Sequence, residues 1–141
     1  MNNQQKCEFG KLYNNISLRK LNAWKIGGVA ENYFRPNSLE DCQDFLRKYP
    51  KNKTITWLGL GSNVLIRDEG VSGCIIHTLS GLKKKNYSEN KQMFYVEAGV
   101  PCCQMSRFVA RNNHHGAEFL AGVPGTMGGA LAMNAGAHGS E

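Results

Sequence analysis

The fold is decided by residues 58–65, which read LGLGSNVL and lie between two runs of strand-forming residues. The glycines of this stretch, Gly59 and Gly61, allow consecutive backbone amides to turn inward, and a nest of N–H groups binds phosphate oxygens. The Ser62 hydroxyl and the Asn63 amide would add donors. Taken alone, the motif is also compatible with a hairpin turn.

A second glycine-rich stretch, residues 122–130, reads GVPGTMGGA. A short helix beginning at Thr126 would offer its N–H groups and the positive end of its dipole to a pyrophosphate. No Lys or Arg lies nearby in the sequence, so backbone donors would hold such an anion. A tight packing corner is the alternative interpretation of this stretch.

Two common nucleotide-binding motifs are excluded. The Rossmann fingerprint requires a third glycine and a helix directly after the loop, whereas the apolar run at residues 64–66 predicts a strand. The phosphate loop of nucleoside triphosphatases requires a Gly-Lys-Ser/Thr sequence, which does not follow residues 122–130.

The pattern around the two loops predicts alternating strands and helices. The expected strands cover residues 30–35, 54–58, 64–67, 74–78 and 93–97. One helix is expected from the N-cap Ser38 to a stop at Pro50, and another from Pro101 with Gly116 as its C-terminal signal. The order of strand, helix and strand from residue 30 predicts a βαβ unit. His77 is expected to be a hydrogen-bonded structural residue.

Composition limits the class of protein. The chain has 141 residues, enough for one globular domain, and no apolar run long enough to span a membrane. The N-terminus is polar. The cysteines are five, an odd number, and form no Cys-x-x-Cys pair, so their pattern fits neither a disulfide framework nor a zinc site. We therefore expect a cytoplasmic protein with no membrane and no metal partner.

The formal charge of +6 raises the alternative of a cofactor-free, basic nucleic-acid-binding module. The dense basic run is residues 83–85, and Tyr87 is the one aromatic residue close to it. Single-strand binders interleave several stacking rings with their basic residues. A solvated turn or strand edge is the preferred interpretation, and no nucleic-acid partner is expected.

Four blocks of sequence resemble the UDP-N-acetylenolpyruvoylglucosamine reductase family. They are NAWKIGG at residues 22–28, the two glycine-rich stretches, and NAGA at residues 134–137. The resemblance implies an α+β fold, an FAD-binding domain of the vanillyl-alcohol-oxidase (PCMH) type. In that fold a small βαβ subdomain packs on a second sheet with helices, and FAD lies between them. Residues 1–141 would form this domain, with subdomains of roughly 20–80 and 81–141.

The resemblance also implies a reaction. The family converts UDP-N-acetylglucosamine enolpyruvate to UDP-N-acetylmuramate for peptidoglycan synthesis: NADPH reduces the flavin, whose N5 passes hydride to the enolpyruvyl group. The family's catalytic Arg, Ser and Glu lie beyond Glu141, so we expect a truncated chain that lacks the substrate-binding domain and is inactive alone. The FAD domain of another flavin oxidase or dehydrogenase is the alternative.

The residues that match the family's FAD contacts are glycines and their neighbours. They are Gly59, Leu60, Gly61, Ser62, Asn63, Val64, Gly122, Val123, Pro124, Gly125, Met127, Gly128, Gly129, Ala130, Asn134 and Gly136. His138 stands where the family commonly has tyrosine near the substrate, and Ala23 replaces a threonine. We expect a bulky residue at position 128 to abolish flavin binding while the fold is kept.

Overall fold

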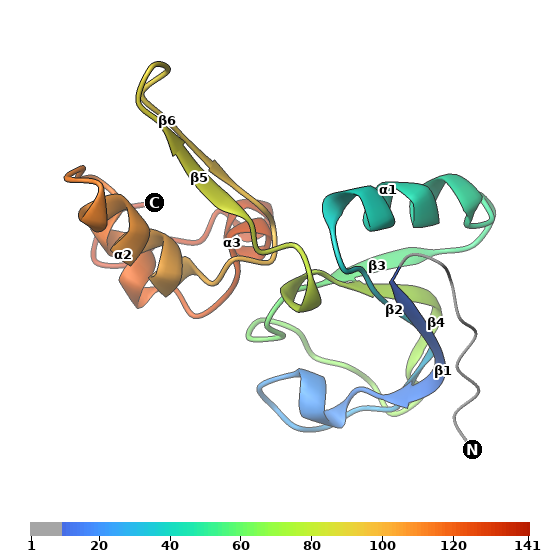
Figure 1. Ribbon diagram of the computed structural model, residues 1–141. Coiled ribbons are helices and arrows are strands. Elements are labelled where there is room, and N and C mark those ends of the chain that lie inside the picture. Colours follow the sequence, from blue (N-terminus) through green and yellow to red (C-terminus); the bar gives the residue numbers. More distant parts are fainter. Residues whose placement is uncertain (1–9) are drawn as a thin grey trace.

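Residues 10–141 are described by the computed structural model of the chain (Figure 1). The strands are β1 (Lys11–Ser17), β2 (Val29–Arg35), β3 (Ile55–Leu58), β4 (Val71–His77), β5 (Lys85–Ser88) and β6 (Met93–Val96). The helices are α1 (Leu39–Lys48), α2 (Cys102–Arg111) and α3 (Met127–Met133), with 3-10 turns η1 (Arg19–Leu21), η2 (Thr78–Ser80) and η3 (Glu118–Gly122). In Figure 1 the β1–β4 sheet and α1 lie on one side, and the β5–β6 hairpin, α2 and α3 on the other.

The larger sheet has the strand order β1-β2-β4-β3. β2 and β3 both run parallel to β4, which lies between them, and β1 is antiparallel to β2. The predicted βαβ unit is therefore present as β2, α1 and β3, with β4 inserted between its strands. The sequence analysis did not predict β1 or β5.

Helix α1 begins and ends where the sequence predicts. The Ser38 hydroxyl accepts a hydrogen bond from the Asp41 N–H at 3.2 Å, and the Asp41 carboxylate accepts one from the Asn37 N–H at 2.9 Å. These two bonds satisfy free N–H groups at the helix start. Pro50 follows the C-cap residue Tyr49 and prevents continuation.

The two faces of the larger sheet are covered differently. On one face Phe34, Cys74 and Ile76 pack against α1, and the Phe34 and Phe45 rings stack with centroids 4.0 Å apart. Strand alternation turns Tyr33 and Ile75 to the other face, where they pack with segments of irregular backbone. That second face leads to the glycine loops.

Residues 64–67 are irregular, so the prediction of a strand there is wrong. Ile66 is buried against the sheet, but the backbone of this segment pairs with no strand in residues 10–141. The Arg67 carbonyl instead accepts hydrogen bonds from the Gly28 and Gly70 N–H groups. The apolar residues of this segment pack against the sheet, and burial by packing does not require strand pairing.

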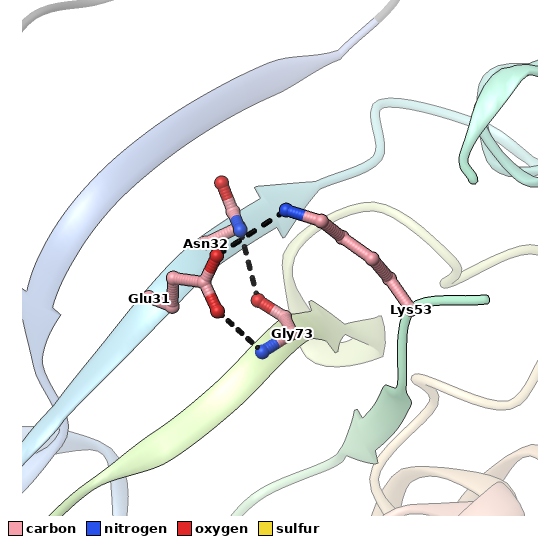
Figure 2. A network of polar contacts seen from close by, with 4 residues as sticks. All are labelled: Glu31, Asn32, Lys53 and Gly73. Carbon is pink, nitrogen blue, oxygen red and sulfur yellow. Dashed lines mark hydrogen bonds and ion pairs between the residues drawn. The ribbon is translucent and has the colours of Figure 1, made fainter.

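A register shift interrupts the pairing of β2 with β4 between Ala30 and Asn32. Side chains bond the backbone there: Glu31 accepts from the Gly73 N–H at 2.8 Å, and Asn32 donates to the Gly73 carbonyl at 3.0 Å (Figure 2). Lys53 Nζ lies 3.4 Å from the second Glu31 oxygen. The Gly73 hydrogen bond and the Lys53 charge together lower the pKa of Glu31.

The β5–β6 hairpin, α2 and α3 have a hydrophobic core that is separate from the core of the larger sheet. It is built from Val100, Cys102, Met105, Val109, Leu120, Val123 and Ala130. The sequence placed Pro101 at the first helical position of α2. In the structure Pro101 is the N-cap residue, one position earlier. The prediction that Gly116 ends this helix is wrong, because α2 ends at Arg111 and Asn113 already takes the left-handed conformation at φ 58°.

The thiols of the described residues are unbridged. Cys42, Cys74, Cys102 and Cys103 are free, and Cys7 lies outside the described residues. Burial raises the pKa of the Cys74 thiol to about 12, so this group stays protonated at neutral pH.

Candidate functional site

A hollow of about 420 Å³ lies between two glycine-rich loops. The first glycine loop (residues 59–64) follows β3, and the second glycine loop (residues 122–130) contains the start of α3. The hollow is lined by residues 57–64 and 123–126 and by Gly129, Ala130, Ala132, Met133, Ala135 and Gly136. Because the loops belong to the two groups of elements, the hollow lies at their junction.

The two loops contact each other directly. The Ser62 hydroxyl donates a hydrogen bond to the Pro124 carbonyl. A Cβ atom at Gly59 would lie 2.4 Å from Thr126 Oγ1, so the first loop passes against Thr126 with no room for a side chain. The Ser62 hydroxyl, expected from sequence to be a ligand donor, therefore holds the loops together.

The end of β4 fixes the carbonyl groups that enter the first loop. His77 Nε2 lies 3.1 Å from the Gly59 carbonyl oxygen, and the Thr78 hydroxyl donates to the Leu58 carbonyl at 3.2 Å. The other ring nitrogen of His77 bonds the Tyr33 hydroxyl at 2.5 Å. The predicted structural role of His77 is confirmed. Burial lowers the pKa of His77, so its ring is neutral at physiological pH.

Residues 22–28 contact the first glycine loop through the backbone. The Ala23 N–H donates to the Gly61 carbonyl at 2.9 Å. Gly61 has φ +75°, and a Cβ atom there would lie 2.0 Å from the Leu21 carbonyl oxygen. Asn22 fixes this supporting segment by donating to the carbonyls of Leu18 and Ile26 at 2.8 and 2.9 Å.

The first loop offers backbone donors. The N–H groups of Leu60, Gly61, Ser62 and Asn63 donate no hydrogen bond to any group in residues 10–141. Backbone donors near a hollow normally find a partner in protein, water or ligand. A run of consecutive amides is the feature that binds phosphate oxygens.

The second loop offers fewer donors than the sequence predicts. The Met127 and Gly128 N–H groups donate to the Val100 and Ala98 carbonyls at 2.8 and 2.9 Å, so two of the expected helix-start donors are already used. The Gly125 and Thr126 N–H groups, directly before α3, have no partner within residues 10–141. Thr126 is 1% exposed, which makes its unpaired amide a buried donor.

The lining of the hollow carries no charged side chain. Its polar side chains belong to Ser62, Asn63 and Thr126, and the rest of the surface is apolar or backbone. As expected from sequence, backbone donors would hold an anion here. Within residues 10–141, no three potential metal ligands come together, and no helix is long and apolar enough to cross a membrane.

Comparison with known proteins identifies the family. A family model described as FAD binding domain matches residues 30–141. The chain belongs to the FAD binding domain family. The predicted α+β fold of an FAD-binding domain is thereby confirmed.

This FAD binding domain is similar to proteins named UDP-N-acetylenolpyruvoylglucosamine reductase. The protein from Nitrosococcus oceani is 45% identical over 92% of this chain and 43% of its own length, and that from Legionella pneumophila strain Corby is 48% identical over 94% and 42%. A crystal structure of the reductase from Thermus caldophilus matches with a TM-score of 0.69 and 27% identity, over 94% of this chain and 46% of that chain. The chain thus spans less than half the length of these relatives.

The donor set of the hollow fits FAD. The cofactor carries a pyrophosphate, which the unpaired amides of residues 60–63, Gly125 and Thr126 would hold, and its uncharged parts suit the apolar remainder of the lining. The glycines at 59 and 61 let the main chain reach the hollow without a side chain in between.

Five residues expected to contact the cofactor or the substrate do not line the hollow: Gly122, Met127, Gly128, Asn134 and His138. Asn134 instead donates to the Glu141 carboxylate at 3.0 Å. The ring of His138 lies against Gly122, where a Cβ atom would come within 2.6 Å of His138 Nε2. Tertiary contacts formed by these residues were not visible in the sequence.

Gly128 is a packing position. A Cβ atom there would lie 2.7 Å from the Ala98 Cβ atom, and its N–H is bonded to the Ala98 carbonyl. A bulky residue would therefore displace the start of α3, so we expect a cost in stability besides the predicted loss of flavin binding.

The sequence did not point to several lining residues, above all Trp57 and Met133, whereas Thr126 was expected only as the start of a helix. Trp57 is 52% exposed on β3 beside the first loop, an unusual position for a large ring, but the strand pattern alone did not show where it points. Thr126 had a local signal, since a threonine before a helical run is a favoured N-cap and its hydroxyl accepts from the Gly129 N–H at 3.4 Å.

Proposed function

We propose that this FAD binding domain holds the flavin of a UDP-N-acetylenolpyruvoylglucosamine reductase. The observation that carries the proposal is the set of unpaired backbone amides from two loops at one uncharged hollow. The names of relatives that are 45% and 48% identical to this chain support the choice of reductase over other flavin enzymes. The blocks at residues 22–28 and 124–136 support the same choice.

The residues of this chain would bind and orient the cofactor. The amides of residues 60–63, together with those of Gly125 and Thr126, would hold the pyrophosphate, and the Ser62 bond to Pro124 would keep the two loops at a fixed separation. When bound, FAD would supply the redox chemistry, the transfer of a hydride from NADPH to the enolpyruvyl group of UDP-N-acetylglucosamine enolpyruvate, whose other carbon would take up a proton. The product, UDP-N-acetylmuramate, belongs to peptidoglycan synthesis in the cytoplasm.

Reduction of the substrate would require residues outside this chain. The hollow is lined by no titratable side chain that would donate or accept a proton. We expect the 141 residues to bind FAD without turning over the UDP-sugar. Asn134 and Gly136 follow α3 and would lie near the flavin, whereas His138 would lie on the side of the substrate.

Comparison of FAD with riboflavin tests this proposal. Riboflavin lacks the pyrophosphate, so it should bind this chain at least about a hundredfold more weakly than FAD, a difference of about 3 kcal/mol. Flavin fluorescence measured during titration gives both dissociation constants. Equal affinity for the two flavins would exclude the amides as a pyrophosphate site.

The choice of reductase needs the longer protein. Addition of UDP-N-acetylglucosamine enolpyruvate to the FAD-loaded protein should perturb its flavin absorbance, and NADPH should then reduce the substrate. If the flavin absorbance does not change on addition of this UDP-sugar, the domain would belong to another flavin oxidase or dehydrogenase.

A further inference from the structure

A chain of hydrogen bonds runs from the interior of the larger sheet to the first glycine loop. The Tyr33 hydroxyl on β2 lies 2.5 Å from His77 Nδ1, and His77 Nε2 at the end of β4 lies 3.1 Å from the Gly59 carbonyl oxygen. Tyr33 is 5% exposed, so the first bond of the chain is shielded from water.

The acceptor at one end fixes the direction of both bonds. A carbonyl oxygen accepts only, so His77 Nε2 must carry the proton that bonds Gly59. Nδ1 of the neutral ring is then bare and accepts from the Tyr33 hydroxyl. Burial raises the pKa of Tyr33 to about 12, so the phenol keeps the proton that it donates.

The surroundings oppose a second proton on His77. Burial of the ring lowers its pKa most, the hydrogen bond to Gly59 acts in the opposite direction, and the positive charges of Arg35 on β2 and Lys83 after η2 lower the pKa further. The neighbouring Tyr13 ring, on β1, packs on Tyr33 with centroids 6.2 Å apart. A proton on Nδ1 would also remove the acceptor of the buried Tyr33 hydroxyl.

We propose that His77 is a positioning residue for the cofactor: its neutral ring holds the Gly59 carbonyl and thereby sets the first glycine loop for binding FAD. This inference rests on the proposed function. Gly59 directly precedes the unpaired amides of residues 60–63, so rotation of its peptide unit moves the first of these donors. The Nε2–H donor to the Gly59 carbonyl is present in both protonation states of the ring, so removal of the donor, and not a change of pH, tests the positioning role.

Two substitutions of His77 separate positioning from general stability. His77→Gln keeps an N–H donor toward Gly59, so FAD affinity should stay near that of the unchanged chain. His77→Leu removes the donor and should weaken FAD binding about tenfold.

His114→Gln is the matched control. His114 Nε2 bonds the Tyr87 hydroxyl at 2.7 Å, a second histidine–tyrosine pair, but it does not line the hollow. FAD affinity should be unchanged in this variant. A loss of affinity in His77→Gln as large as that in His77→Leu, or full affinity in His77→Leu, would overturn the proposal.

Nuclear magnetic resonance tests the positioning without FAD. The ¹⁵N spectrum of the unchanged chain should show the Nε2–H tautomer of His77, and the Leu60 amide should titrate with the same midpoint as the ring. In His77→Gln the Leu60 amide should not titrate. An Nδ1–H tautomer, or a Leu60 amide that ignores His77, would contradict the positioning role. A chain that passes this test but binds no FAD would contradict the proposed function alone.

Discussion

Glycines of the first loop shape the backbone, whereas the glycines that begin α3 allow two segments to pack. Gly61 has φ +75° and lies against the Leu21 carbonyl, a position that only glycine adopts without strain. Gly128 has no positive φ, and its restriction comes from the Ala98 side chain and backbone. The two glycine-rich stretches therefore contain glycine for different physical reasons.

The difference extends to the backbone donors. In the first loop the amides of residues 60–63 remain unpaired, whereas the Met127 and Gly128 amides of the second loop bond to residues 98–100. Only Gly125 and Thr126, directly before α3, add free donors from that side. A glycine-rich stretch thus identifies a candidate anion site, but the donors available for a ligand depend on which carbonyls the rest of the fold brings near.

The largest expected effect is that of Gly61→Ala. The added Cβ atom would lie 2.0 Å from the Leu21 carbonyl oxygen at a positive φ, so we expect a loss of about 3 kcal/mol or more in unfolding free energy, and loss of FAD binding. Urea unfolding followed by circular dichroism measures the first effect and flavin titration the second.

Gly116→Ala is the matched control for that variant. Gly116 has φ +93°, and a Cβ atom added there would meet no atom within 4 Å, so only the backbone conformation is penalised, by about 1 kcal/mol. FAD binding should be unaffected. Equal effects of the two variants would show that the contact with Leu21 does not matter.

Gly128→Ala should have a smaller effect. Its Cβ atom would lie 2.7 Å from the Ala98 Cβ atom, and we expect about 1–3 kcal/mol of destabilisation with weaker FAD binding as the start of α3 shifts. The adjacent Gly129→Ala makes only an ordinary contact at 3.5 Å and should raise stability by about 0.5–1 kcal/mol through helix propensity. Thermal unfolding of both variants measures the contrast, and a stable Gly128→Ala variant would remove the packing explanation.

Ser62→Ala tests the contact between the loops. Removal of the hydrogen bond to the Pro124 carbonyl should cost about 1 kcal/mol of stability and weaken FAD binding about fivefold. Ser38→Ala provides the control, because it removes the α1 N-cap at a similar cost in stability but should leave FAD affinity unchanged. If both variants bind FAD equally well, the loops do not need this bond.

The smallest expected effect is at Glu31, which bonds Gly73 and Lys53 and does not line the hollow (Figure 2). Its pKa is lowered from 4.5 by the Gly73 hydrogen bond and Lys53, so its contribution to stability is present above pH 4.5 and is lost as pH falls through the lowered value. Glu31→Gln should flatten this part of the acid unfolding curve and leave FAD affinity intact. Unfolding followed by circular dichroism between neutral and acid pH would detect either result.

Local signals in the sequence predicted much of this fold. The cap at Ser38, the stop at Pro50 and the strand-forming runs of β2 and β4 each depend on neighbouring residues, and all three appear in the structure. Residues 64–67 misled because an apolar run reports burial, and Ile66 is buried by packing without strand pairing.

The candidate site was predicted less completely. Both glycine loops were recognisable, since glycine clusters are local, and most of their residues line the hollow. Three contacts of the site join residues that are distant in the sequence. They are the hydrogen bonds of Gly128 to Ala98, of Ser62 to Pro124 and of His77 to Gly59. No local pattern could reveal them.

An FAD titration of the ¹⁵N-labelled chain, followed by amide chemical shifts, tests the proposed cofactor site most directly. We predict saturable binding, with the largest shifts at residues 60–63, Gly125 and Thr126 and small shifts at Gly128, whose N–H is already bonded. Failure of the folded chain to bind FAD, or shifts confined to residues outside the two loops, would contradict a pyrophosphate site built from these amides.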